Sequence, residues 1–235
     1  MADYDLYYWP VPFRGEFIRA ILAYAGKSWA EHDAEAIGAL MEADPAEQPV
    51  PFMGPPLLIE KSSGFALSQM PAIAVYLGTT LDLIPASAAL RALTAKVVND
   101  ATDVIDEITL DGGREMWTSK SWDEFVPRLQ RWMMFWEVMG TRHGLEAETG
   151  YLLGTDQPGV ADIVTATLWS RMADRFPAIR AILEQTAPKT AGLMLRMQAL
   201  PALAALNERS SAQYGEVYCG GDIETSLRAV LRRQT

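Results

Sequence analysis

Cysteine, histidine and long apolar runs are all scarce in this chain of 235 residues. The single cysteine, Cys219, excludes an internal disulfide and any thiol pair for redox chemistry. The histidines, His32 and His143, share no ligand spacing with acidic residues, so no metal site is expected. No apolar run approaches the ~20 residues that span a bilayer, and the acidic N-terminus lacks the pattern of a signal peptide. We therefore expect a cytoplasmic protein without a membrane partner.

Basic residues are outnumbered by acidic ones. The chain has 20 Lys and Arg against 30 Asp and Glu, a formal net charge of −10. Binding to phosphates requires clustered basic side chains, so this balance argues against nucleic acid or an anionic membrane as a partner. Apolar residues make up 49% of the chain, which is ample for a sizeable core.

The start of the chain has the pattern of a short strand that runs into an amphipathic helix. Residues 6–11 read Leu-Tyr-Tyr-Trp-Pro-Val, typical of a strand that ends at a proline. Phe17, Ile21 and Ala25 follow at intervals of four, which places them on one stripe of a helix. A loop between a strand and a helix often opens onto a functional site. Tyr8 carries a phenol that can donate a hydrogen bond to an anion there, although packing is the commoner role for such a tyrosine.

Further along, the pattern changes from mixed strands and helices to helices alone. Residues 57–60 and 65–67 have the pattern of a hairpin around a turn at 61–64. Apolar residues then step by threes and fours through 90–108 and again through 122–140. We predict an α/β domain of order βαβαββα at residues 1–78, a linker at 79–87 and an all-α domain at 88–235.

Three blocks of the chain match one known family in order. They are Tyr8-Trp9 with Arg19-Ala20-Ile21-Leu22, then residues 56–78, then residues 151–154 with 159–163. Together they resemble the glutathione transferases of the tyrosine type, with an N-terminus similar to the mu and sigma classes. The resemblance implies the cytosolic glutathione transferase fold, in which a thioredoxin-like domain precedes an all-α domain.

The resemblance also implies a mechanism and a set of site residues. In that family the tyrosine hydroxyl donates a hydrogen bond to the sulfur of glutathione, which makes Tyr8 the expected catalytic residue. Glutathione is then a co-substrate, and no cofactor is expected. The residues implied to bind glutathione are Trp9, Arg14, Pro55, Pro56, Gln69, Met70 and Asp103. The residues implied to form an electrophile pocket are Val11, Pro12, Phe13 and Trp117.

The chain departs from the family pattern where glutathione would bind. Met70 stands where a serine usually holds the γ-glutamyl carboxylate, and Pro71 removes one more N–H from the same helix end. If Pro56 is the family's cis-proline, the preceding Pro55 has no N–H for the cysteinyl carbonyl. Pro51 is the alternative cis-proline, with a poorer distance to the third helix. We predict weak glutathione binding that Met70→Ser improves, unless Met70 only packs beneath the hairpin and another donor holds the carboxylate.

Two functions are compatible with these patterns. The first is a cytoplasmic, homodimeric glutathione transferase of detoxification, which conjugates glutathione to small apolar electrophiles. The second is a transferase-like binding or interaction protein with weak or no affinity for glutathione, which the departures favour. In the family, the helix matching 90–108 borders both the cleft and the dimer interface, so Asp103 could reach the amino group of a glutathione on the partner subunit. For Cys219, beside a turn, we expect a structural or incidental role.

Overall fold

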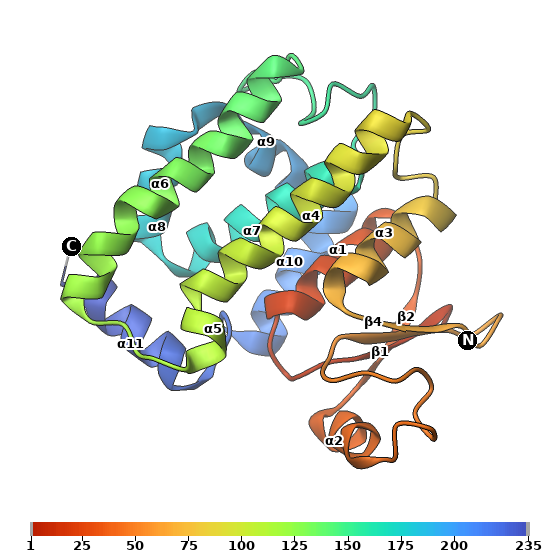
Figure 1. Ribbon diagram of the computed structural model, residues 1–235. Coiled ribbons are helices and arrows are strands. Elements are labelled where there is room, and N and C mark those ends of the chain that lie inside the picture. The colour runs from red at the N-terminus through yellow and green to blue at the C-terminus, as the bar shows by residue number, and fades with distance from the viewer. Residues whose placement is uncertain (1, 234–235) are drawn as a thin grey trace.

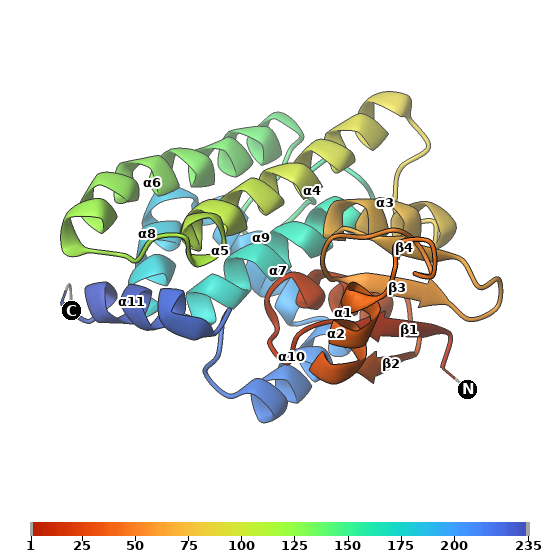
Figure 2. The ribbon, with the colours of Figure 1, turned by 60° about the horizontal axis from the view of Figure 1, so that its bottom comes forward.

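The computed structural model describes residues 2–233 and shows a small sheet with three helices beside a larger helical part (Figures 1 and 2). The N-terminal elements follow in the order βαβαββα, which confirms the predicted thioredoxin-like arrangement. Helices alone, α4 to α11, follow them. None of the helices between residues 2 and 233 combines the length and apolar character needed to cross a membrane.

The sheet is mixed, with the strand order β2-β1-β3-β4. Its strands are β1 (Tyr4–Tyr7), β2 (Trp29–His32), β3 (Leu57–Glu60) and β4 (Ala66–Ser68). β1 runs parallel to β2, with Tyr4 opposite Trp29, and antiparallel to β3, with Tyr4 opposite Glu60. Because a parallel pair needs a crossover connection, α1 (Phe13–Tyr24) lies between β1 and β2 in the chain.

Helices cover both faces of the sheet, as Figure 1 shows. Successive strand residues point to opposite faces, so Leu58 joins the large core with Leu6 and Ile18, whereas Leu57 joins a small cluster with Ile37. Ile37 belongs to α2 (Ala34–Glu42), and α1 lies on the opposite face with α3 (Met70–Thr80). Both faces are therefore buried by helices.

The first strand lies earlier than residues 6–11, where the sequence predicts it. β1 begins at Tyr4 and includes Asp5, an unfavourable residue for a strand, whose side chain has two partners on the neighbouring strand and turn. Its carboxylate lies 3.0 Å from Nε2 of His32 and 3.5 Å from Nζ of Lys61. β1 ends before Tyr8, and Pro10 beyond it has no N–H for a sheet. Tyr8 thus belongs to the loop and not to the strand.

The helical part is built around α7 (Val160–Arg175). Every residue of this helix except Asp174 is buried, which is typical of a helix enclosed by others. The carboxylate of Asp162 holds its start, accepting hydrogen bonds from the N–H groups of Gly159 at 2.9 Å and Leu152 at 2.7 Å. α7 packs against α1, so one continuous core joins the two parts of the chain.

The remaining helices partly follow the predicted periodicity. They are α4 (Ala88–Ile108), α5 (Leu110–Gly113), α6 (Ser119–Arg142), α8 (Pro177–Thr186), α9 (Pro188–Gln198), α10 (Pro201–Tyr214) and α11 (Gly221–Leu231). α4 and α6 confirm the two long stripes. The sequence pattern did not reveal α8, which begins at a proline, as α9 and α10 also do. Proline in the first turn costs no hydrogen bond, so these prolines start helices instead of breaking them.

Candidate functional site

A cavity of about 460 Å³ opens where the loop after β1 meets the helical part. The N-terminal part contributes Tyr8, Trp9, Val11, Phe13, Arg14 and Pro55 to its lining. The helical part contributes Thr109, Gly112, Gly113, Met116, Cys219, Gly220, Gly221, Asp222 and Ile223. The cavity therefore brings together chain segments that lie more than two hundred residues apart.

Tyr8 lies in the wall of this cavity, and its hydroxyl accepts one hydrogen bond from the protein. The side chain is only 4% exposed, and its hydroxyl oxygen accepts a hydrogen bond from the N–H of Arg14 at 3.0 Å. Burial raises the pKa of Tyr8 to about 12 and outweighs the opposing effect of the Arg14 charge. The phenol consequently keeps its proton at neutral pH and can donate it in a hydrogen bond.

The ring of Tyr8 is fixed by Gly15 in the first turn of α1. A Cβ atom at Gly15 would lie 2.5 Å from Cδ1 and 2.8 Å from Cγ of Tyr8, closer than any real contact. Only glycine therefore allows α1 to approach the ring this closely. The guanidinium of Arg19 lies 5.9 Å from the centroid of the same ring.

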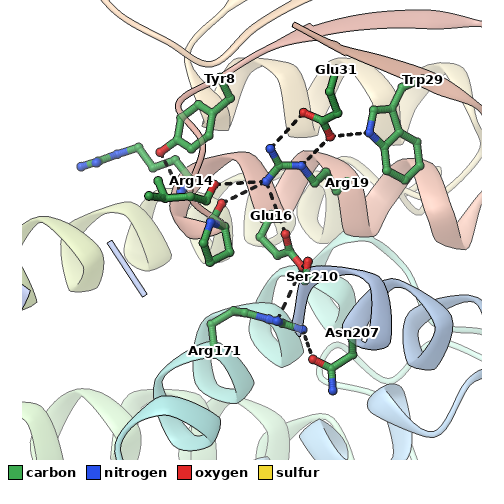
Figure 3. Close-up of polar contacts among 11 residues, drawn as sticks. Tyr8, Arg14, Glu16, Arg19, Trp29, Glu31, Arg171, Asn207 and Ser210 are labelled. Carbon is green, nitrogen blue, oxygen red and sulfur yellow. Dashed lines mark hydrogen bonds and ion pairs between the residues drawn. The ribbon is translucent and has the colours of Figure 1, made fainter. Parts of the chain in front are cut away.

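Arg19 also anchors the loop that carries Tyr8 (Figure 3). Its Nη1 donates to the carbonyl oxygens of Pro12 at 3.3 Å and Val11 at 3.4 Å. Its Nε and Nη2 donate to the two carboxylate oxygens of Glu31 at 2.7 and 3.0 Å. Such a bidentate ion pair has a defined geometry. Glu31 of β2 therefore fixes the position of the Arg19 guanidinium, which in turn fixes the loop through its hydrogen bonds to Val11 and Pro12.

Glu16 extends this polar network into the helical part, as Figure 3 shows. It is almost fully buried and accepts a hydrogen bond from the hydroxyl of Ser210 at 2.5 Å. Its carboxylate also lies 3.7 Å from Nη1 of Arg171 and 3.4 Å from Nη1 of Arg19. The sequence analysis missed this network; the only local signal is the spacing of three between Glu16 and Arg19, which suits one helix face.

Arg14 lines the cavity but is not free. Its guanidinium forms an ion pair with Asp106 of α4 and lies 4.8 Å from the ring centroid of Phe13. On the same face of α4, Asp103 is exposed and makes no ion pair in the described part of the chain. Partial burial, then the neighbouring Asp100 and Asp106, raise the pKa of Asp103. Asp103 does not line the cavity.

The cis-proline lies where the sequence analysis preferred it. The peptide bond between Pro55 and Pro56 is cis, and Pro51 has no cis bond. Pro55 lines the cavity, whereas Pro56 is buried behind it. Since Pro55 has no N–H, this strand end offers a ligand no donor at that position.

Gln69 lies beside a different hollow, of about 330 Å³, which Ser68 and residues of the segment 45–53 also line. The backbone of Gln69 is left-handed, with a φ of 73° at the start of α3. Such a conformation costs a non-glycine residue ~1–3 kcal/mol and is held by its surroundings. Gln69 is therefore not among the residues that line the cavity of Tyr8.

Met70 packs in the core, as the alternative interpretation of the sequence proposed. Its side chain is 1% exposed, so only its backbone N–H is available to a ligand. Pro71 is the second residue of α3, and the N–H of Ile73 donates to the carbonyl of Gln69 at 3.0 Å. Ile73 is therefore not one of the free donors at this helix end, which leaves the N–H groups of Met70 and Ala72.

Two residues expected in the electrophile pocket lie elsewhere. Trp117 is 5% exposed, and its Nε1 donates to the carbonyl of Ile108 at 2.9 Å inside the helical core. Its neighbour Met116 lines the cavity instead. Pro12 is buried, and its carbonyl faces Arg19. Hydrophobicity alone does not distinguish a core residue from a residue of a cavity wall, so the sequence could not separate these positions.

The sequence analysis did not foresee the wall formed by residues 219–223. Glu224 of α11 shapes it, because one carboxylate oxygen accepts hydrogen bonds from the N–H groups of Tyr218, Cys219 and Gly220 at 3.0, 2.9 and 2.6 Å. Cys219 is part of this wall, and burial, with a smaller contribution from Glu224, raises the pKa of its thiol to about 12. The paired glycines after Cys219 were the one available signal.

Comparisons with known proteins agree on one family. Residues 93–230, more than half of the chain, match the model of the glutathione S-transferase C-terminal domain. The solved structure of NaGST-2 is 25% identical with a TM-score of 0.71, over 88% of this chain and 97% of that one. A nematode glutathione transferase specific to C. elegans is 22% identical with a TM-score of 0.71, over the same shares.

A third solved structure is described as a monomer. It is the monomeric Na-GST-3 of the hookworm Necator americanus, 23% identical with a TM-score of 0.70, over 88% of this chain and 96% of that one. A sequence comparison with curated proteins yields no significant match. The matched domain, the order of elements and the similar structures lead to the same conclusion: the chain belongs to the glutathione S-transferase family.

Proposed function

We propose that the chain is a glutathione transferase in which the Tyr8 hydroxyl stabilises the glutathione thiolate. One observation carries the proposal. Tyr8 lines the 460 Å³ cavity with a hydroxyl that accepts a hydrogen bond from Arg14 and has no acceptor of its own within residues 2–233. Its proton therefore remains available to an acceptor in the cavity, and a thiolate sulfur is such an acceptor.

The chemistry requires only one good hydrogen bond. A free thiol with a pKa of ~8.5 is mostly protonated at pH 7. A hydrogen bond to a charged group contributes ~1.5–3 kcal/mol, and each unit of pKa corresponds to ~1.4 kcal/mol. A bond from Tyr8 would therefore lower the thiol pKa by about one to two units. Because burial keeps the phenol protonated, Tyr8 remains a donor after the thiol has ionised.

A small apolar electrophile suits the other walls of the cavity. Val11 and Phe13 contribute apolar surface from the N-terminal part, and Met116 and Ile223 from the helical part. An electrophile placed among these side chains lies in the same cavity as the Tyr8 hydroxyl. Its apolar surface would leave water there, which favours binding.

The remainder of glutathione would extend from this cavity towards Gln69. Pro55 lines the cavity, while Pro51 and Met53 line the hollow beside Gln69, so one short segment borders both. Three extended residues span ~10 Å, which suits a tripeptide lying along that segment. The free N–H groups at the start of α3 would attract its carboxylate.

One set of observations favours the second function, a binding protein with weak affinity for glutathione. Pro55 and Pro71 offer no N–H, Met70 buries its side chain, and Ile73 uses its N–H within the helix. Each lost hydrogen bond to a charged group costs roughly tenfold to a hundredfold in affinity. Weak binding of the γ-glutamyl carboxylate follows from this end of α3.

The proposed transferase activity is tested on wild type, Tyr8→Phe and Tyr7→Phe. Calorimetry measures the binding of glutathione, and an assay with chlorodinitrobenzene measures turnover. Tyr7 is the matched control because its ring points to the other face and stacks on His32 at 4.1 Å. We expect Tyr8→Phe to retain binding and to lose about tenfold to a hundredfold in turnover, while Tyr7→Phe behaves as wild type. Full activity in Tyr8→Phe would refute the role of Tyr8. A wild-type chain that does not bind glutathione at millimolar concentration would favour the second function.

We also propose that the chain forms a homodimer through α4 and α6. Met134, Phe135 and Val138 of α6 are exposed apolar side chains close together on one helix. Asp103 on α4 would then stand where the partner's glutathione amino group approaches. Sedimentation of wild type and Phe135→Asp tests this, and a wild-type monomer of 25.9 kDa at micromolar concentration would contradict it. The cytoplasmic location and the role in detoxification stay predictions.

A further inference from the structure

A second hollow, of about 210 Å³, lies where α7 ends, α8 begins and the last turns of α11 pass by. Its lining consists of Arg175, Phe176, Pro177, Ala178, Arg228, Leu231 and Arg232, and none of these residues lines the cavity of Tyr8. Figures 1 and 2 show this end of α11 at the side of the molecule away from the sheet. Three arginines around one hollow are unexpected in a chain with a net charge of −10.

Arg175 carries a positive charge that no carboxylate of residues 2–233 pairs with. The residue is 8% exposed, and its Nε and Nη2 atoms are buried without a hydrogen-bond partner. In the described part of the chain, no carboxylate lies within ion-pair distance of its guanidinium. Arg171, one turn earlier in α7, has buried nitrogens without hydrogen bonds as well, but Glu16 lies 3.7 Å from its Nη1. An unpaired buried charge is costly, so an anion at Arg175 would remove a penalty.

The carboxylate nearest to Arg175 in sequence is committed elsewhere. Asp174 accepts hydrogen bonds from Nη2 of Arg180 at 2.5 Å and from Nε2 of Gln198 at 3.1 Å. Glu224, on α11, is occupied by three backbone N–H groups and by Nε of Arg228 at 2.8 Å. Within residues 2–233, neither of these carboxylates is therefore available to Arg175.

The start of α8 adds to the positive potential at the hollow. Pro177 is the first residue of this ten-residue helix, and the N–H of Ala178 next to it donates no hydrogen bond within the helix or to the described surroundings. Free N–H groups at a helix start attract anions. Arg228 also lies at the hollow, with its guanidinium 5.0 Å from the ring centroid of Phe176, but its charge is paired with Glu224.

Apolar side chains form the rest of the hollow. Phe176, Pro177 and Leu231 would contact the uncharged part of a ligand. The volume of about 210 Å³ is below the ~300–1,000 Å³ of pockets for drug-sized ligands. We propose that this hollow binds a small organic anion, a carboxylate or phosphate group on an apolar or aromatic frame, with Arg175 as its principal partner. The planar guanidinium matches both oxyanions in geometry.

Calorimetry on the full-length protein with four probes tests the ligand class. Benzoate and phenyl phosphate carry the two anions on the same ring, benzamide is the uncharged analogue of benzoate, and inorganic phosphate lacks the ring. We expect at least one of the two ring anions to bind at millimolar concentration or below, and benzamide and inorganic phosphate to bind at least tenfold more weakly. The stronger ring anion distinguishes carboxylate from phosphate. Absence of binding by both ring anions, or equal binding of benzamide, overturns the proposal.

Variants then locate the site. Arg175→Met keeps the length and apolar stem of the side chain, and we expect it to weaken binding of the anion about tenfold to a hundredfold. Arg175→Lys should retain part of the affinity, which shows that charge and not folding is responsible. Arg142→Met, at an exposed arginine that does not line the hollow, is the matched control and should bind as wild type. Full binding in Arg175→Met overturns the assignment.

The cavity of Tyr8 also contains an arginine, so a second control separates the two sites. We expect Arg14→Met to leave binding of the ring anions unchanged. Loss of binding in Arg14→Met but not in Arg175→Met would place the anion in the Tyr8 cavity and refute the proposal. Because no step uses glutathione, the outcome does not depend on the proposed transferase activity.

Discussion

Substitution of Gly15 by alanine should impair the proposed catalysis without removing any catalytic group. The new Cβ would lie 2.5 Å from Cδ1 of Tyr8. Ordinary contacts between carbon atoms are at ~3.5–4.0 Å, so the ring or the start of α1 must move by about 1 Å. A misplacement of ~1 Å can reduce a rate by ~10²-fold. We therefore expect a fall in kcat/KM of about tenfold to a hundredfold.

The effect of Gly15→Ala on stability follows from two opposing contributions. Alanine is favoured over glycine inside a helix by ~0.5–1 kcal/mol. Overpacking against Tyr8 costs ~1–3 kcal/mol. The free energy of unfolding should therefore fall by up to about 2.5 kcal/mol.

Gly38 provides the matched control. It also lies within a helix, α2, but a Cβ there meets no atom within 4 Å. Gly38→Ala should raise the free energy of unfolding by ~0.5–1 kcal/mol and leave activity unchanged. Urea unfolding and chlorodinitrobenzene turnover, measured on both variants, test the reasoning. If Gly15→Ala is as active and as stable as Gly38→Ala, the close approach of α1 to Tyr8 does not position the hydroxyl.

Three further predictions follow from the burial and charge of single residues. Met70→Ser should lower the free energy of unfolding in urea by ~2–5 kcal/mol, because it empties a core position; a loss below 1 kcal/mol would contradict the observed packing. In the pH–rate profile, kcat/KM should rise through the thiol pKa and then stay level to at least pH 10, because Tyr8 has a pKa of about 12; a fall that Tyr8→Phe abolishes would show an earlier ionisation. Glu224→Gln should reduce the free energy of unfolding at pH 7 by ~1.5–3 kcal/mol, with exposed Glu216→Gln as its control. Burial raises the pKa of Glu224, but hydrogen bonds from the Gly220 N–H and Arg228 outweigh it, so the folded pKa is lowered. The stabilisation is thus present above the unfolded pKa and is lost as pH falls through the folded pKa, and the two unfolding curves should converge in acid.

The sequence by itself determined the class of fold and the main candidate for catalysis. Periodic apolar residues identified α4 and α6, and the resemblance pointed to the cis-proline at Pro56 and to Tyr8. These features are encoded locally. The spacing of side chains along a helix or strand decides which face is apolar. Such spacing does not depend on where other segments lie.

Only the tertiary structure decided which side chains face a cavity. Trp117 and Met116 are neighbours and both apolar, yet only Met116 lines the cavity of Tyr8. Met70 could not be distinguished in sequence from a ligand-facing residue, because its burial depends on the packing of α3. An apolar side chain gains free energy when it leaves water. Its hydrophobicity does not indicate whether other side chains or a ligand will cover it.

The polar contacts that hold the site were also beyond the sequence. Glu16 and Ser210 are separated by 194 positions, and the wall formed by Glu224 belongs to the last helix. Arg175 is one arginine among many in the sequence, and only its packing shows that no carboxylate of the described residues pairs with it. Local patterns determine elements, whereas the partner of a charged side chain is decided when distant elements pack together. Local sequence patterns therefore determine the secondary-structure elements. The chemistry of the site depends on contacts between N-terminal and C-terminal segments of the chain.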